Sequence, residues 1–447
     1  MCAKDGVQVV SASPLRLDLR ILCTRDGNPV RKNLDIWPTF PIHIEYFYPR
    51  TIEGIDEDNL IAALERPDRV SSLCLGLSWP TGPRFRFFQR FLRKMVRVMQ
   101  APFPALTYLF LSMVTSEDVP VLPSEFLGRS APRLQKIELI NIPFPALPVL
   151  LSSTSHLVKL YLVTIPQTGY IPPEVMVAAL ATLESLEDLG VGFQSPASRP
   201  NQIRLPPMTR IVLPALTSFK FRGVREYLED FVARISAPRL HKIWTSYFNQ
   251  LVDFEVPQIW QFIDRSENLN QPRCCLVNFQ NDDVSFGAGP TTHWHITESE
   301  SFEDTSPVIY VRIGCKGLDW QVSHLAQALN QISAVLSNIL HFAIDSDSIN
   351  TDPDDMDDIE WLQLLRPFSS AQTLFVSKEF AGQVSHVLEN TDVTMANEVL
   401  PVLDMLCLEG QPMTFAHKFI AARWESGHPV TTVDTERAFR ERLESYS

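Results

Sequence analysis

Two histidines and one acidic stretch have side chains of the types that could hold a metal. His293 and His295 flank Trp294, but a bound metal would need two further ligands, and no second cluster with ligand spacing exists. The acidic stretch from Asp345 to Glu360 fails the calcium-loop test, because Ile349 stands where an oxygen ligand is needed and Asn350 where the turn needs glycine. We therefore expect loop histidines, a solvated acidic loop, and no metal or cofactor.

The cysteines and the motif content argue against catalysis. Cys274 and Cys275 are adjacent, so on a strand their thiols point to opposite faces and cannot share a metal or bond easily to each other. The seven cysteines include no C-x-x-C pair, which favours buried free thiols. Nucleophile elbows, G-x-G-x-x-G loops and Walker loops are absent. We expect a protein that is not an enzyme. A hydrolase or metal enzyme in the irregular segment 280–305 is the alternative.

A set of aromatic and cationic residues could bind another protein. They flank the last two leucines of a recurring L-x-x-L-x-L pattern and would therefore share one face of a sheet. Protein-binding hot spots favour Trp, Tyr and Arg. Strands also favour aromatic residues in general, and lysine protects an open sheet from aggregation, so a purely structural role is an equal alternative. The candidate partner-binding residues are Tyr108, Phe110, Lys136, Lys159, Tyr161, Lys220, Arg222, Lys242 and Trp244.

The pattern that positions these residues repeats along the chain. Its middle apolar members stand at positions 109, 137, 160, 189, 219 and 243, so the successive separations are 28, 23, 29, 30 and 24 residues. These separations lie close to the period of leucine-rich repeats, about 20 to 29 residues. A lone strand of this kind cannot bury its apolar face, so neighbouring copies must stack.

Between the strands the apolar spacing changes to that of helices, as in Pro172–Leu183 and Val224–Ile235. The residues Pro83–Gln100 predict an amphipathic helix with a basic, solvated face. The predicted fold class is α/β, a leucine-rich-repeat solenoid with a curved parallel sheet on its concave side and helices on its convex side. Its predicted parts are a disordered remnant at 1–13, the solenoid at 14–425 with an irregular insert near 280–305, and a C-terminal tail at 426–447. Within the insert, the short alternating runs Val284–Phe286 and His293–Ile296 predict strands of an inserted hairpin or loop.

Charge and hydropathy limit the classes of partner. The formal net charge of −13 argues against a nucleic-acid binder, which needs an excess of Lys and Arg. No apolar run reaches the ~18 to 20 residues that span a bilayer, and Met1–Val10 lacks the apolar core of a signal peptide. We expect a cytoplasmic or nuclear protein that binds neither nucleic acid nor membrane and has a protein partner.

Eight stretches together resemble the F-box and leucine-rich-repeat proteins of mushroom-forming fungi. This resemblance implies a substrate receptor, in which an F-box binds the Skp adaptor of a cullin–RING ubiquitin ligase and the repeats bind the target. The matching stretches are SPLRLDLRILCT at Ser13–Thr24, NLDIWPTFPIHI at Asn33–Ile44, APFPALTYLFL at Ala101–Leu111, IPFPALPVLL at Ile142–Leu151, GYIPPEVMVAALATL at Gly169–Leu183, LPPMTRIVLPALTSFKF at Leu205–Phe221, YLEDFVARISAPRL at Tyr227–Leu240 and GLDWQVSHLAQAL at Gly317–Leu329.

One feature of that family has no counterpart in this sequence. Its F-box is a three-helix segment ahead of the SPLRLDLR stretch, and only thirteen residues precede Pro14 here, too few for three helices. No adaptor-binding residue can therefore be assigned, and binding of Skp or cullin is doubtful. The expected function is that of a receptor-like module that recruits a partner protein, with ubiquitination as a possible outcome. The alternative is a scaffold or decoy with no link to a ligase.

Overall fold

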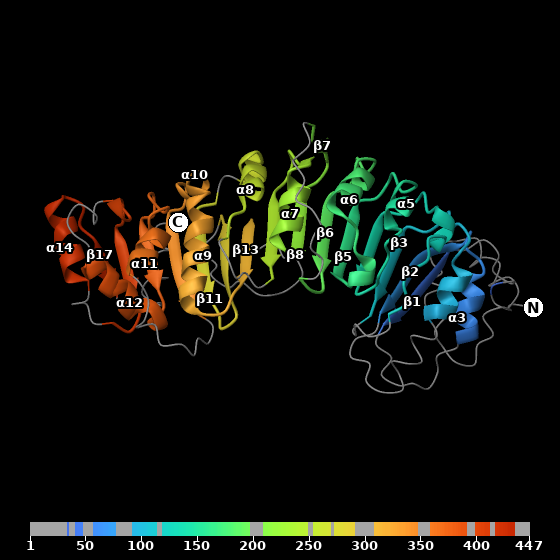
Figure 1. Cartoon of the computed structure of the whole chain (residues 1–447), viewed down its shortest axis with the longest axis horizontal. Helices are drawn as coiled ribbons and strands as arrows, with labels where there is room; N and C mark the ends of the chain where they lie inside the picture. The colour runs from blue at the N-terminus through green and yellow to red at the C-terminus, as the bar shows by residue number, and fades with distance from the viewer. Residues whose placement is uncertain are drawn as a thin grey trace, which may run out of the picture. The chain divides into compact units, whose positions relative to one another are not determined.

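The computed structural model describes most of the chain. The described residues are 34, 41–47, 57–76, 92–113, 119–196, 209–248, 254–269, 272–290, 308–346, 358–390, 398–411 and 416–433. Within them the chain is an α/β protein, whose 15-stranded, largely parallel sheet alternates with helices (Figure 1). The chain divides into two compact units, which we describe separately. Unit 1 comprises residues 1–220 and 234–237, and unit 2 comprises residues 221–233 and 238–447.

The strands of unit 1 lie beside one another in the order in which they occur in the sequence. Each strand from β1 to β6 pairs in parallel with the next, and β8, which ends in unit 2, follows β6. The short strands β7 (Ile211–Val212) and β9 (Ile235–Ser236) form a separate parallel pair. The main strands are β1 (Ile42–Phe47), β2 (Val70–Gly76), β3 (Tyr108–Ser112), β4 (Lys136–Ile140), β5 (Lys159–Ile165), β6 (Asp188–Phe193) and β8 (Ser218–Gly223).

Helical segments connect these strands. Residues 92–98 are also helical; there Leu92 and Met95 are buried while Arg93 and Lys94 are exposed, as the amphipathic pattern predicts. The remainder of that predicted helix, residues 83–91, lies outside the described residues. The other helical segments of unit 1 are α3 (Glu57–Leu64), η3 (Phe126–Arg129), α5 (Leu147–Leu151), η4 (Gln167–Gly169) and α6 (Pro173–Leu180).

The repeated apolar positions form the core, as the sequence predicts. Leu109, Ile137, Leu160 and Leu189 lie in β3 to β6 and are fully buried. In the register they stand directly opposite one another across neighbouring strands. Burial of each of these four side chains contributes roughly 2 kcal/mol, so the row holds the strands together.

In unit 2 the strand order departs from the sequence order. The sheet runs β10-β13-β12-β11-β14-β15-β16-β17, and β12 is antiparallel to both of its neighbours. β17 pairs with β16, although its residues fall in the predicted C-terminal tail. The strands are β10 (Lys242–Tyr247), β11 (Cys274–Phe279), β12 (Asp283–Gly289), β13 (Ile309–Gly314), β14 (His341–Ser346), β15 (Thr373–Val376), β16 (Met405–Leu408) and β17 (Thr431–Val433).

The change of order arises at the segment that the sequence predicts to be irregular. A tight turn, closed by a hydrogen bond from Gln280 N to Asp283 O of 2.8 Å, reverses the chain after β11. The predicted strand Val284–Phe286 lies in the resulting strand β12, which confirms a hairpin there. The second predicted strand, His293–Ile296, lies outside the described residues. Because β13 is antiparallel to β12, it runs in the same direction as β10 and pairs with β10 along its other edge.

Two helices of unit 2, α11 (Asp358–Leu365) and α12 (Lys378–Glu389), pack on one face of this sheet. Phe279 of β11 contacts the rings of Trp361 and Phe380, which marks the helix-covered face. The helical segments are α7 (Arg225–Val232), α8 (Pro257–Asp264), η5 (Glu267–Leu269), α9 (Leu318–Asn330), α10 (Ser333–Leu336), α11 (Asp358–Leu365), α12 (Lys378–Glu389) and α14 (His417–Glu425).

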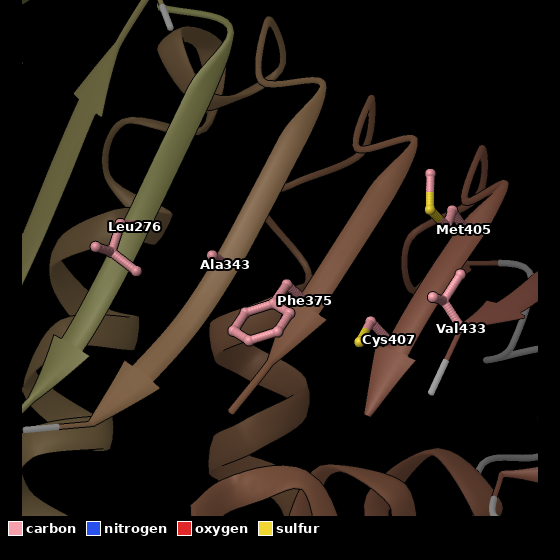
Figure 2. Close-up of a cluster of buried hydrophobic side chains, with 6 residues drawn as sticks. All are labelled: Leu276, Ala343, Phe375, Met405, Cys407 and Val433. Atoms are coloured by element: carbon pink, nitrogen blue, oxygen red, sulfur yellow. The ribbon is translucent and has the colours of Figure 1, made fainter. Parts of the chain in front are cut away.

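The opposite face of unit 2 carries a second buried row. Leu276, Ala343, Phe375, Cys407 and Val433 stand opposite one another across β11, β14, β15, β16 and β17. All five are at most 7% exposed, and Figure 2 shows them, with Met405, on the same side of the strands. Side chains on a strand alternate between faces, so this row lies away from the helices that Phe279 contacts.

The described cysteines confirm the prediction of buried free thiols. Cys74, Cys274, Cys275, Cys315 and Cys407 are all buried and form no disulfide. Burial raises the pKa of Cys274 to about 12 and that of Cys315 to about 12. These thiols are therefore protonated at neutral pH and poor nucleophiles.

A half-buried carboxylate of α7 that lies against the start of α8 predicts a pH-dependent stability. Glu229 of α7 accepts hydrogen bonds from Gln258 N at 2.8 Å and Ile259 N at 3.0 Å, which are amides of the first turn and lack partners within the helix. These bonds favour the carboxylate, but burial outweighs them and raises the pKa of Glu229 to about 7. The folded protein therefore binds this proton more tightly than the unfolded chain does.

We expect the stabilisation from protonated Glu229 to be complete below pH ~4.5 and to be lost as the pH rises through about 7. Between pH 5 and pH 8 the loss should amount to about 1–3 kcal/mol. Urea unfolding at both pH values, compared between the wild type and Glu229→Gln, measures it, because the amide does not titrate. Parallel pH responses in the two proteins would contradict the assignment.

Candidate functional site

The structure brings six of the nine predicted binding residues together on one face of unit 1. Tyr108 and Phe110 come from β3, Lys136 from β4, Lys159 and Tyr161 from β5, and Lys220 from β8. We call the surface formed by these six residues, together with the neighbouring Glu138, Ile140, Val163 and Asp188, the Tyr161 face. Arg222, Lys242 and Trp244 belong to unit 2 and are described separately below.

Strand register sets the layout of the Tyr161 face. One row across β3, β4 and β5 consists of Tyr108, Lys136 and Lys159. The next row, two residues further along each strand, consists of Phe110, Glu138 and Tyr161. Since two residues of a strand span about 7 Å, the rows lie at that separation. We call the row with the two lysines the charged row and the row with Phe110 and Tyr161 the aromatic row. The aromatic row has one carboxylate, that of Glu138, at its centre.

The ring of Tyr161 is held by neighbours on both sides. A Cβ atom on Gly190, which stands opposite Tyr161 on β6, would lie 2.9 Å from Cδ1 of the ring, so the ring rests directly against the glycine backbone. Lys159 Nζ lies 4.2 Å from the ring centroid and Lys220 Nζ lies 5.8 Å from it. A cation at such a distance contributes roughly 0.5–1 kcal/mol at an exposed site. These contacts hold the ring in place.

Glu138 links the charged row to the aromatic row. Its Oε1 lies 3.1 Å from Lys159 Nζ, and both side chains are partly buried. Burial raises the pKa of Tyr108, and the charge of Glu138 raises it further. Burial also raises the pKa of Tyr161, with additional contributions from Asp188 and Glu138. Both phenols are consequently neutral at physiological pH and can donate hydrogen bonds.

Two apolar residues of this face are not among the binding residues predicted from the sequence. Ile140 and Val163 stand opposite each other on β4 and β5 and are half-exposed. They follow the last leucine of their repeats by one position, so the period of two places them beside Glu138 and Tyr161. Extending the alternation one residue beyond the L-x-x-L-x-L pattern would have found them.

The three predicted residues of unit 2 have different surroundings. Trp244 stacks on Tyr310 of β13, with ring centroids 5.4 Å apart and an angle of 9° between the planes. The guanidinium of Arg222 lies 5.7 Å from the ring of Phe248. Lys242 is half-buried at the start of β10.

The residues considered for metal binding give no assembled centre in the described part of the chain. His293 and His295 lie outside it, as do all the acidic residues between Asp345 and Asp358. Among the residues that the structure describes, no group of three or more His, Cys, Asp and Glu could hold a metal ion. None of the described helices combines the length and apolar character that crossing a bilayer would require.

Fold and site together define an α/β protein with a preformed aromatic and charged face on a parallel sheet. Comparison of the chain with models of known protein families gives no match, and comparison with curated proteins gives none. Membership of the F-box and leucine-rich-repeat group therefore stays a prediction from the resemblance.

Proposed function

We propose that this protein is a leucine-rich-repeat solenoid that recruits a partner protein through the Tyr161 face, which would be its concave surface. The main support is the geometry of Tyr161, a half-exposed ring held against Gly190 and flanked by two ammonium groups. Aromatic anchors of this kind dominate the energetics of protein interfaces.

The repeated architecture of unit 1 supports the solenoid. Its parallel strands follow sequence order, their inward leucines align in register, and helical segments alternate with them. Each such unit buries its apolar side against the next. The opposite face then presents one variable position after another, which suits recognition of an extended partner surface.

Pre-ordering supports binding on energetic grounds. Ordering a long side chain during association costs about 0.5–1.5 kcal/mol. Here the ion pair between Lys159 and Glu138 and the contact of Lys159 with Tyr161 already fix these side chains. Part of the free-energy cost of ordering these side chains is therefore incurred on folding and does not reduce the affinity.

We expect the double variant Lys159→Ala, Tyr161→Ala to lose at least about 30-fold in affinity for the partner, because hot-spot residues contribute 2 kcal/mol or more. Tagged full-length protein from its native cells, quantified by mass spectrometry, provides the partner, and titration with the purified partner gives the affinity. Val149→Ala is the control, since Val149 is exposed and lies on helix α5, not on a strand that forms this face. A double variant that binds as tightly as the control would refute the proposed surface.

The resemblance to F-box receptors extends the proposal to a ubiquitin ligase. In that role the Tyr161 face would hold the protein to be ubiquitinated. Recovery of Skp or cullin with the tagged protein, together with a shorter partner half-life when the protein is expressed, would support this role. Recovery of a partner without either ligase subunit would favour the scaffold or decoy.

A further inference from the structure

We infer that the partner segment carries a bulky apolar side chain with a carboxylate about two residues away. The apolar side chain would cover Tyr161 and Val163, and the carboxylate would lie between Lys136 and Lys159. This inference rests on the proposed function and specifies the chemistry of its partner.

The aromatic row continues into an apolar patch. Phe110, Ile140, Tyr161 and Val163 are half-exposed and lie on three adjacent strands. The one charge among them, Glu138, already has Lys159 as its counterion at 3.1 Å. A partner charge placed over this patch would lose water without gaining a free counterion, whereas an apolar side chain gains from burial.

The charged row, in contrast, favours a negatively charged group over an apolar side chain. Lys136 and Lys159 stand directly opposite each other on β4 and β5, an arrangement in which like charges repel. Lys136 is exposed and forms no ion pair with any residue in the described ranges. Asp188 stands opposite Lys159 on the other side, and Glu138 lies two residues beyond Lys136 on its own strand. A carboxylate from the partner therefore fits best on the Lys136 side, where it relieves the repulsion.

The separation of the two rows sets the spacing in the partner. The rows are about 7 Å apart, which is the distance spanned by two residues of an extended chain. An extended peptide running along β5 would thus place an acidic residue about two positions from its apolar anchor.

Selection from a random 12-residue peptide library tests the inference. The bait is the purified full-length chain, and Val163→Asp serves for counter-selection. We expect the enriched peptides to share Leu, Phe, Met or Trp with Asp or Glu about two residues away. The affinity of a synthetic consensus peptide should fall at least about 30-fold for Val163→Asp and about 3- to 10-fold for Lys136→Glu. It should be unchanged for Val149→Asp.

The possible outcomes separate the inference from the proposed function. Enriched peptides that are basic or wholly polar, but still need Tyr161, would overturn the inference and leave the binding face intact. Peptides that bind Tyr161→Ala and Val163→Asp as well as the wild type would overturn both. If no peptide is enriched on the wild type relative to Val163→Asp, the inference is also overturned. The titration with the purified partner tests the proposed function independently. Circular dichroism of each variant verifies folding.

Discussion

Replacement of Gly190 by valine is expected to weaken partner binding by at least about 30-fold, although the added side chain introduces no charge. Its Cβ would lie 2.9 Å from Cδ1 of Tyr161, closer than Cβ atoms approach a neighbour, and 3.3 Å from Cγ, which is a tight contact. The ring must therefore swing away from β6 and leave its position beside Lys159. Valine itself suits a strand, so the sheet should persist while the anchor moves.

A double-mutant cycle distinguishes this effect from general damage. If Gly190 acts through Tyr161, then Gly190→Val added to Tyr161→Ala should cost no further affinity, because the ring it displaces is already absent. Gly382→Ala is the glycine control, since among the described residues outside its own helix a Cβ there would meet only Gln411 Nε2, at 3.7 Å. Additive losses in the cycle would show that valine acts on the sheet and not on the ring.

Much of unit 1 is predictable from sequence because its determinants are local. The alternation of leucines fixes which side chains face inward, and the repeat separation fixes which strands are neighbours. Leu109, Ile137 and Leu160 accordingly occupy equivalent positions in β3, β4 and β5. The same alternation places Tyr108, Lys136 and Lys159 in one row, so most of the Tyr161 face follows from the pattern.

Features that depend on pairing between distant segments are not predictable in this way. The insertion of β13 and β12 between β10 and β11 follows from two reversals of chain direction, one at Gln280 and one between β12 and β13, and the leucine repeat marks neither of them. The role of Gly190 is also hidden, because it arises only when β6 lies beside the ring of Tyr161. Trp244 shares the sequence pattern of Tyr161, yet it packs on Tyr310, which comes from β13 and could not be foreseen as its neighbour.

Trp361→Ala is expected to produce the largest loss of stability in unit 2. The indole is fully buried on α11, and its ring centroid lies 5.9 Å from that of Phe279 and 5.6 Å from that of Phe380. These three rings join β11, α11 and α12, so truncation leaves a cavity at a junction of three elements. Such substitutions cost about 3–5 kcal/mol. For the 223 residues of unit 2, counted from 221–233 and 238–447, this corresponds to a melting temperature lower by about 10 °C.

Trp361→Phe separates the packing of the ring from the polarity of the indole. The indole Nε1 is buried and has no hydrogen-bond partner among the described residues. Replacing the indole therefore breaks no hydrogen bond and removes an unsatisfied buried donor. We expect phenylalanine to retain most of the ring contacts and to cost less than about 1.5 kcal/mol. Differential scanning calorimetry measures both variants, and hydrogen exchange should show the loss of protection for alanine in β11, α11 and α12. Equal destabilisation by alanine and phenylalanine would mean that the indole acts through its nitrogen, and the aromatic junction would not be what holds these elements together.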